Sequence, residues 1–119
     1  MLVEGHAAHV LVLDDEEVRL KAFRRKLIGN IVLTVKTADE CIKALENSTW
    51  DYVFLDHDLG GNILVESGRG TGYEVAEWLS NHPEKKPKDI IIHSFNAAGA
   101  KNMLSLLPEA KYIPGIWTL

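Results

Sequence analysis

Short apolar runs that end in polar residues alternate along this chain with segments of helical period. Residues 9–13 are mostly apolar and precede an acidic pair, and residues 52–55 precede a further acidic residue. Residues 31–35 and 90–93 have the same apolar character. Such runs, bounded by polar residues, are typical of strands buried on both faces of a parallel sheet. The alternation predicts repeated strand–helix units, and therefore an α/β fold with a mostly parallel sheet and helices on both faces.

The segments between the apolar runs carry helix signals. Residues 16–27 place apolar side chains at helical spacing, and their basic residues lie toward the C-terminal end, where the helix dipole favours cations. Thr37 and Thr71 are each followed three residues later by Glu, the capping-box pattern that opens a helix. Asn96 is a candidate N-cap for a further helix. We expect a last strand at residues 111–113 or 116–119.

Composition narrows the class of protein. The chain has 119 residues and a formal net charge of -4, which argues against bulk electrostatic binding of nucleic acid. The single Cys41 excludes an intramolecular disulfide framework and a multi-cysteine zinc site. No apolar run approaches the ~20 residues that span a bilayer, and residues 1–9 lack the pattern of a signal peptide. We therefore expect a single cytoplasmic domain over residues 1–119.

Polar residues gather at the predicted strand ends. Ligands of doubly wound sheets bind at the carboxyl ends of strands, where the strand order reverses. Three of these ends carry acidic, imidazole or hydroxyl side chains, in the segments Asp14-Asp15, Asp56-His57-Asp58 and His93-Ser94. Converging carboxylates repel one another unless one takes up a proton or a cation offsets their charge, and oxygen ligands suit Mg²⁺ or Mn²⁺. Beside such a metal, Asp56 could act as a nucleophile toward a phosphoryl group, and Ser94 could donate a hydrogen bond to it.

The order and spacing of these motifs resemble the receiver domain of bacterial response regulators. The matching segments are Val12-Leu13-Asp14-Asp15, Val53-Phe54-Leu55-Asp56 and Ile92-His93-Ser94, within a resemblance that covers roughly residues 9–114. The resemblance implies a flavodoxin-like, doubly wound, five-stranded parallel sheet. It also implies that Asp56 accepts a phosphoryl group and that Ser94 is the residue that switches when Asp56 is phosphorylated. The metal ligands that it implies are Asp14, Asp15, Asp56 and the backbone carbonyl of Asp58, which here also brings a carboxylate.

The chain departs from the receiver pattern in three places. The family usually has Lys before Pro at the end of the last strand, where this chain has Ile113 before Pro114, and Lys111 lies two residues earlier. The loop between the third strand and the next helix is several residues longer than is usual in the family. Only five residues follow Pro114, so the last helix is missing. The exposed sheet face would then be covered by Trp117 and Leu119, by a partner or by a second copy.

A narrower group, the cyclic-phosphate-processing receivers, is similar to this chain at Asp56-His57-Asp58-Leu59 and at His93-Ser94-Phe95-Asn96. The role proposed for that group involves cyclic phosphates of nucleotides or RNA. A histidine near a strand end is often a hydrogen-bonded structural residue, but two histidines beside carboxylates also suit metal ligation or acid–base chemistry, so His57 and His93 join Asp56 as candidate catalytic residues.

Further candidates are phosphate-binding residues outside the acidic segments. Ser94 and Asn96 follow the fourth predicted strand, and each is equally suited to capping the next helix. Arg69 stands in a glycine-rich segment before a predicted helix, where backbone N–H groups can bind an anion. The alternative is that this segment is a flexible loop or a lid.

Three functions remain open at this point. The first is a signalling module of a phosphorelay, in which a phosphodonor kinase phosphorylates Asp56. The second is a metal-dependent enzyme that acts on a phosphate ester such as a cyclic phosphate. The third is a pseudo-receiver that binds a partner without being phosphorylated. The missing lysine weakens the first, the two histidines favour the second, and the open sheet face suits the third.

Overall fold

The computed structural model describes residues 7–119, which form a five-stranded parallel sheet in the order β2-β1-β3-β4-β5. The strands are β1 His9–Leu13, β2 Ile31–Val35, β3 Tyr52–Leu55, β4 Asp89–Ile92 and β5 Lys111–Tyr112. The helices are α1 Glu17–Lys26, α2 Ala38–Asn47, α3 Gly72–Asn81 and α4 Ala97–Leu106, with short 3₁₀ helices η1 Pro83–Lys85 and η2 Ile116–Thr118. The predicted flavodoxin-like α/β fold is confirmed, and within residues 7–119 the segment after β5 forms η2 in place of an α-helix.

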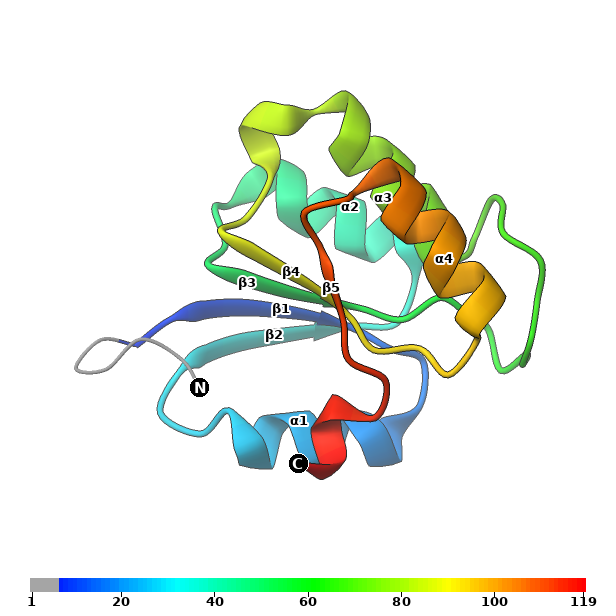
Figure 1. Ribbon diagram of the computed structural model, residues 1–119. Helices are drawn as coiled ribbons and strands as arrows, with labels where there is room; N and C mark the ends of the chain where they lie inside the picture. Colours follow the sequence, from blue (N-terminus) through cyan, green and yellow to red (C-terminus); the bar gives the residue numbers. More distant parts are fainter. Residues whose placement is uncertain (1–6) are drawn as a thin grey trace.

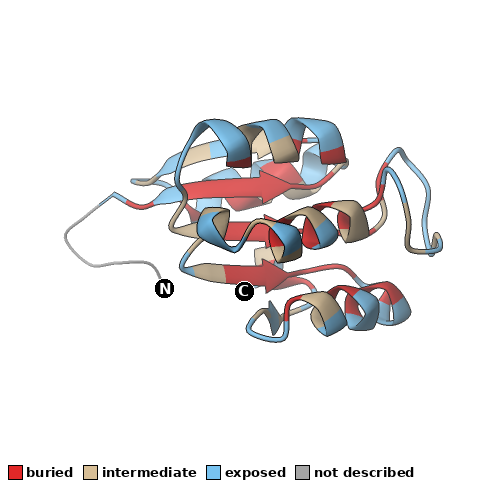
Figure 2. Ribbon diagram, turned by 90° about the horizontal axis from the view of Figure 1, so that it is seen from above, coloured by how far each residue is buried: buried red, intermediate tan, exposed pale blue. Residues whose placement is uncertain are grey.

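Helices cover both faces of the sheet, but unequally (Figure 1). One face carries α2, α3 and α4, and the other carries α1 with η2 beside it. The middle strands are buried on both faces (Figure 2), as their continuous apolar runs predict. No helix within residues 7–119 is long and apolar enough to cross a bilayer. Residues 1–6, which bear on the predicted domain start and on the signal peptide, lie outside the described residues.

The segment after β5 takes over part of the role of the missing helix. Ile116 of η2 is 5% exposed and packs in the same apolar cluster as Phe23 of α1 and Phe54 of β3. Trp117 lies at the edge of this cluster, whereas Leu119 is 76% exposed. Of the two residues that we expected to cover this face, Trp117 therefore does so and Leu119 does not.

The predicted helix starts are confirmed by their capping bonds. The side chains of Thr37, Thr71 and Asn96 accept hydrogen bonds from backbone N–H groups in the first turns of α2, α3 and α4. Of the two sites expected for the last strand, the earlier one forms β5. A strand at residues 116–119 is wrong, because Gly115 adopts a φ of 71° and turns the chain into η2.

Candidate functional site

The parallel register brings three polar residues together at the carboxyl edge of the sheet. Leu13 pairs with Leu55, and Leu55 pairs with Ile92. The residues that follow these three are Asp14, Asp56 and His93, and all three are buried. One ligand atom from each lies within 4.8 Å of the others, an arrangement consistent with a divalent metal site.

Asp14 is the most completely bonded member of this acidic cluster. Its carboxylate accepts two bonds of 2.8 Å from Arg19, through Nε and Nη2, and lies 3.0 Å from Nε2 of His93. The backbone N–H of Glu16 donates a further bond of 2.9 Å. Burial by itself raises the pKa of the carboxyl group, but the bonds from His93 and Arg19 outweigh it and lower the pKa of Asp14 to about 2. Asp14 is therefore ionised at neutral pH.

Asp56 has far fewer partners than Asp14. One of its oxygens accepts a bond of 2.8 Å from the backbone N–H of His57, and the other lies 3.5 Å from Nη2 of Arg19. Burial, reinforced by the negative charge of Asp14, raises the pKa of Asp56 to about 6. Asp56 is thus poised to change its protonation state near neutral pH.

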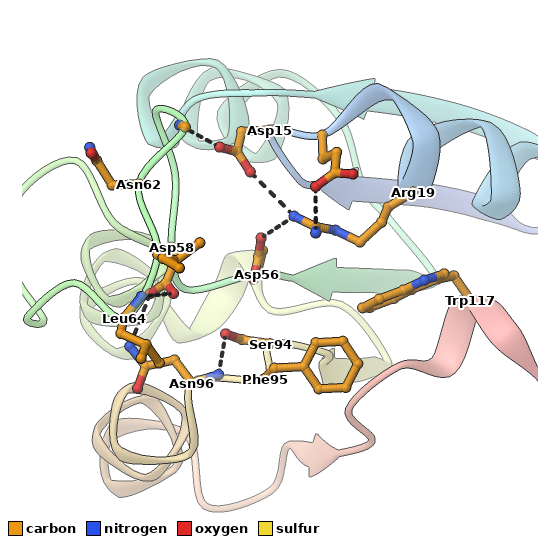
Figure 3. Close-up of a pocket in the computed structure, with 13 residues that line it drawn as sticks. Asp15, Arg19, Asp56, Asp58, Asn62, Leu64, Ser94, Phe95, Asn96 and Trp117 are labelled. Atoms are coloured by element: carbon orange, nitrogen blue, oxygen red, sulfur yellow. Dashed lines mark hydrogen bonds and ion pairs between the residues drawn. The ribbon is translucent and has the colours of Figure 1, made fainter.

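Arg19, in the first turns of α1, is the functional residue that sequence reasoning missed. Besides its fork to Asp14, it donates from Nη1 to Glu16 at 2.8 Å and lies 3.4 Å from Asp15 (Figure 3). The bond to Asp14 raises the pKa of Arg19 above its already high ordinary value. The signal available in the sequence was a long basic side chain in the first turn of a helix that begins just after the acidic pair, close enough for Arg19 to reach back to the strand end.

An open cavity of about 300 Å³ lies above Asp56. Five predicted site residues line it, namely Asp15, Asp56, Asp58, Ser94 and Asn96. Arg19, Phe95 and Trp117 complete one wall (Figure 3). The two aromatic rings meet edge to face with centroids 5.3 Å apart, and the guanidinium carbon of Arg19 lies 5.5 Å from the ring centroid of Trp117. Phe95 is 68% exposed, so this wall offers an accessible aromatic surface beside the charged floor.

His57 and His93, expected as catalytic residues, do not line the cavity. His57 is enclosed: its Nδ1 lies 2.7 Å from Asp58 and its Nε2 lies 2.9 Å from Ser67. A Cβ atom at Gly99 would come within 2.6 Å of its ring, which shows how closely α4 packs on it. His93 contacts Asp14 with one nitrogen, and its Nδ1 has no hydrogen-bond partner among the described residues. Neither imidazole therefore reaches the cavity: His57 packs beneath the loop that follows β3, and His93 faces the acidic cluster.

Asp58 and Asn96 organise the loop that follows β3. Asn96 donates to Asp58 at 2.9 Å and to the carbonyl of Val65 at 3.1 Å. The second carboxylate oxygen of Asp58 accepts from the backbone N–H of Leu64 at 2.6 Å. Although burial opposes it, the bonds from Asn96, His57 and the loop lower the pKa of Asp58. Both oxygens of Asp58 are thus engaged with protein groups.

Two cationic residues considered in the sequence lie elsewhere. Arg69 is exposed and lines separate shallow hollows beside Tyr73 and Glu74, so the structure does not bring it to the cavity. Lys111 is exposed and pairs with Ile91 in β5, below the carboxyl edge of the sheet. Within the described part of the chain, no lysine lines the cavity, and its cation is Arg19.

This fold, with acidic residues after β1 and β3, is that of a receiver domain, and solved receivers resemble it. The structure of a phosphorylated cyanobacterial phytochrome response regulator, RcpA, has a TM-score of 0.75 at 18% identity, covering 92% of this chain and 81% of that chain. The response regulator TrrA from Thermotoga maritima, in complex with Mg²⁺-BeF, has a TM-score of 0.68 at 21% identity, covering 88% and 84%. At these identities the similarity establishes the fold alone.

The sequence also matches a protein family, which assigns the chain more narrowly than the fold does. Residues 9–109 match the cyclic-phosphate processing receiver domain, and the chain belongs to this family. No curated protein is significantly similar to the chain.

Proposed function

We propose that this chain processes a cyclic phosphate in the cavity above Asp56. The observation that carries the proposal is the meeting of Arg19, Asp56 and Ser94 around one accessible cavity that no lysine lines in residues 7–119. The family to which the chain belongs supports the same class of substrate. The missing lysine weighs against the ordinary phosphotransfer of receivers, because the usual cationic partner of the phosphoryl group is absent from the wall.

The proposed reaction is the addition of water across one P–O bond of the ring. The water oxygen bonds to phosphorus, the ring P–O bond breaks, and the leaving oxygen takes up a proton, which yields a phosphomonoester. We assign to Asp56 the role of accepting the proton of the water, because it lines the cavity and its carboxylate has few protein partners: one oxygen accepts from the N–H of His57, and the other lies 3.5 Å from Arg19. Ser94 retains its hydroxyl proton for a phosphoryl oxygen, because its Oγ accepts from the N–H of Asn96.

A divalent cation fits the donor set of this site. Asp14, Asp56 and His93 would hold it, and Asp15 lies at the rim of the same cluster. Mg²⁺ or Mn²⁺ would supply positive charge there, offsetting the repulsion between the carboxylates and an anionic substrate. His93 suits Mn²⁺ better than Mg²⁺, because imidazole nitrogen is the softer ligand.

The proposed function is tested with a nucleoside 2′,3′-cyclic phosphate, incubated with the chain and with Mg²⁺ or Mn²⁺. We expect a phosphomonoester product, followed by phosphorus NMR, and a rate about 100-fold or more lower in Asp56→Asn, which cannot accept the proton. Asp39→Asn is the matched control, because Asp39 is exposed on α2. Absence of product with either metal, or equal rates in the two variants, would contradict the proposal.

A second candidate is phosphorylation of Asp56 as a signalling event, which implies a phosphodonor kinase and an output partner. It is supported by the receiver arrangement of Asp14 and Asp56 at adjacent strand ends. A similar response regulator from Burkholderia pseudomallei, at 21% identity and a TM-score of 0.68, is described with a phosphorylated aspartic acid. The similarity covers 89% of this chain and 58% of the Burkholderia pseudomallei chain.

This candidate is tested with a small phosphodonor and Mg²⁺. Intact-mass spectrometry should then show one added phosphoryl group on the wild type and none on Asp56→Asn. An unmodified wild type under conditions that phosphorylate a typical receiver would exclude this candidate.

Binding of a partner or a second copy to the sheet face that carries α1 stays a prediction. The area of that face open to a partner is reduced, because Ile116 and Trp117 of η2 pack against it.

A further inference from the structure

Arg19 lies where a divalent cation shared by the acidic residues would lie. Its Nη2 is 2.8 Å from an oxygen of Asp14, 3.4 Å from one of Asp15 and 3.5 Å from one of Asp56. One nitrogen therefore contacts carboxylates from the ends of two strands and from the turn into α1. No other residue of the described chain reaches all three of these carboxylates.

The guanidinium group and a metal ion cannot share this position. An ion bonded to carboxylate oxygens lies about 2.0–2.2 Å from each of them. Arg19 bonds both oxygens of Asp14 at 2.8 Å and lies 3.5 Å from an oxygen of Asp56, so a metal bonded to Asp14 and Asp56, with His93 as the third ligand, would lie against the guanidinium group. It would also place two positive charges in contact. The donor set fits a metal, but the metal can enter only after Arg19 has moved.

The Arg19 side chain is held by several bonds, but it also borders the cavity, into which it could move. Asp14 binds it through a two-bond fork, and Glu16 and the ring of Trp117 hold its outer side. Its side chain is 24% exposed and lines the cavity, so an adjacent volume is available to it. Asp14, by contrast, has no freedom, because it is fully buried between Arg19 and His93.

We propose that Arg19 is a built-in cation of the acidic cluster, and that a divalent metal ion binds by displacing it into the cavity. Metal binding and release of the guanidinium group are then a single event. The proposal rests on the proposed function for its consequence, since a released Arg19 would meet the phosphate in the cavity. The competition itself is a property of the protein and the metal alone.

The competition is measured by calorimetric titration of Mg²⁺ into the wild type and into Arg19→Gln. Removing the charged competitor should tighten Mg²⁺ binding about 10- to 100-fold, because the metal no longer has to break charge-assisted bonds. Arg24→Gln is the matched control: it removes an exposed arginine of the same helix, which pairs with Glu17. Its Mg²⁺ affinity should equal that of the wild type. A purely structural role of Arg19 would weaken metal binding in Arg19→Gln and would not tighten it.

Release of the guanidinium group has its own optical signal. Arg19 lies over Trp117, so its departure should change the tryptophan emission of the wild type when Mg²⁺ is added. The change should be absent in Arg19→Gln, which still binds the metal, and in Trp117→Phe. Mg²⁺ is used because it does not itself quench fluorescence.

Two results would overturn the inference: equal or weaker Mg²⁺ binding in Arg19→Gln, or the same emission change in that variant as in the wild type. If Arg19→Gln does not fold, Arg19→Lys takes its place, because a lysine cannot form the two-bond fork and should compete less. Tighter binding in Arg19→Lys supports the inference, and unchanged binding rejects it. If only the proposed function is wrong, the wild type will not hydrolyse the cyclic phosphate, but Arg19→Gln will still bind Mg²⁺ more tightly than the wild type does.

Discussion

Two neighbouring carboxyl groups of one acidic cluster have opposite chemical characters. Asp14 is buried but bonded by Arg19 and His93, and its pKa falls to about 2. Asp56 is buried with few partners, and its pKa rises to about 6. The difference follows from bonding, since both groups are removed from water. At neutral pH Asp14 is therefore a fixed charge, whereas Asp56 can exchange a proton.

The raised pKa of Asp56 predicts a pH-dependent effect of Asp56→Asn on stability. A carboxyl group whose pKa rises from 3.8 to about 6 on folding binds its proton more tightly in the folded state. Its contribution to the free energy of unfolding therefore falls as the pH rises from about 4 to about 6, and above this range its buried charge is destabilising. Asp56→Asn removes that charge and should stabilise the fold by about 1–3 kcal/mol near pH 7.5.

Urea unfolding at about pH 7.5 and about pH 4.5 measures this difference. At the lower pH the wild-type Asp56 is largely protonated in the folded state but still mostly ionised in the unfolded state, so the stabilisation should shrink to about a third. The exposed Asp39→Asn serves as the control and should show little change at either pH. Equal stabilisation by Asp56→Asn at both pH values would contradict the raised pKa.

At the scale of elements, α3 begins directly against the backbone that carries Asp56. The N–H of Gly72 donates to the carbonyl of His57 at 2.9 Å, and a Cβ at Gly72 would lie 1.7 Å from the carbonyl oxygen of Asp56. The obstacle is backbone, which cannot rotate away as a side chain can. The helix start thus fixes the position of the strand end on which the site depends.

Gly72→Ala should therefore destabilise the fold by about 2–4 kcal/mol, because the added methyl group forces α3 away from β3. Gly68→Ala, in the loop just before α3, is the matched control, since a Cβ there meets nothing within 4 Å. Thermal unfolding of the two variants measures the effect. A melting temperature of Gly72→Ala equal to that of Gly68→Ala would show that the contact is relieved without strain.

The sequence allowed the elements and part of the site to be predicted. Strand positions follow from apolar runs, and the helix starts follow from Thr37, Thr71 and Asn96, because both signals are local. The parallel order then places the strand ends together. The position of Arg19 could not be read in this way, because it depends on how α1 packs on the sheet. The same limit applies to His57, whose ring direction is set by the approach of α4.

At the scale of the whole molecule, three α-helices cover one face of the sheet, whereas a single α-helix and a short 3₁₀ helix cover the other. The latter two are α1 and η2, a 3₁₀ helix of three residues. Ile116 is its buried anchor, and Trp117 joins the apolar cluster to the cavity wall. Cover of the sheet and shape of the site therefore depend on the same short segment.

Ile116→Ala tests how much this segment contributes. Ile116 is 5% exposed, and its truncation should destabilise the fold by about 2–4 kcal/mol through lost burial and the cavity left behind. Leu119→Ala removes a side chain of the same size class that is 76% exposed, and should change stability by no more than about 0.5 kcal/mol. Urea midpoints measure both. Equal effects of the two substitutions would mean that η2 does not replace the missing helix.

Two carboxylates of the site also hold the long loop after β3. Asp15 accepts from the N–H of Gly61, and Asp58 accepts from that of Leu64, both at 2.6 Å. Asp15 holds the loop through one oxygen, while its other oxygen lies 3.4 Å from Arg19 in the acidic cluster. A ligand that draws the Asp15 side chain toward itself would break the hydrogen bond from the N–H of Gly61 and release the loop at that point. Binding at the acidic cluster would then be felt first in the exposed segment of residues 60–64.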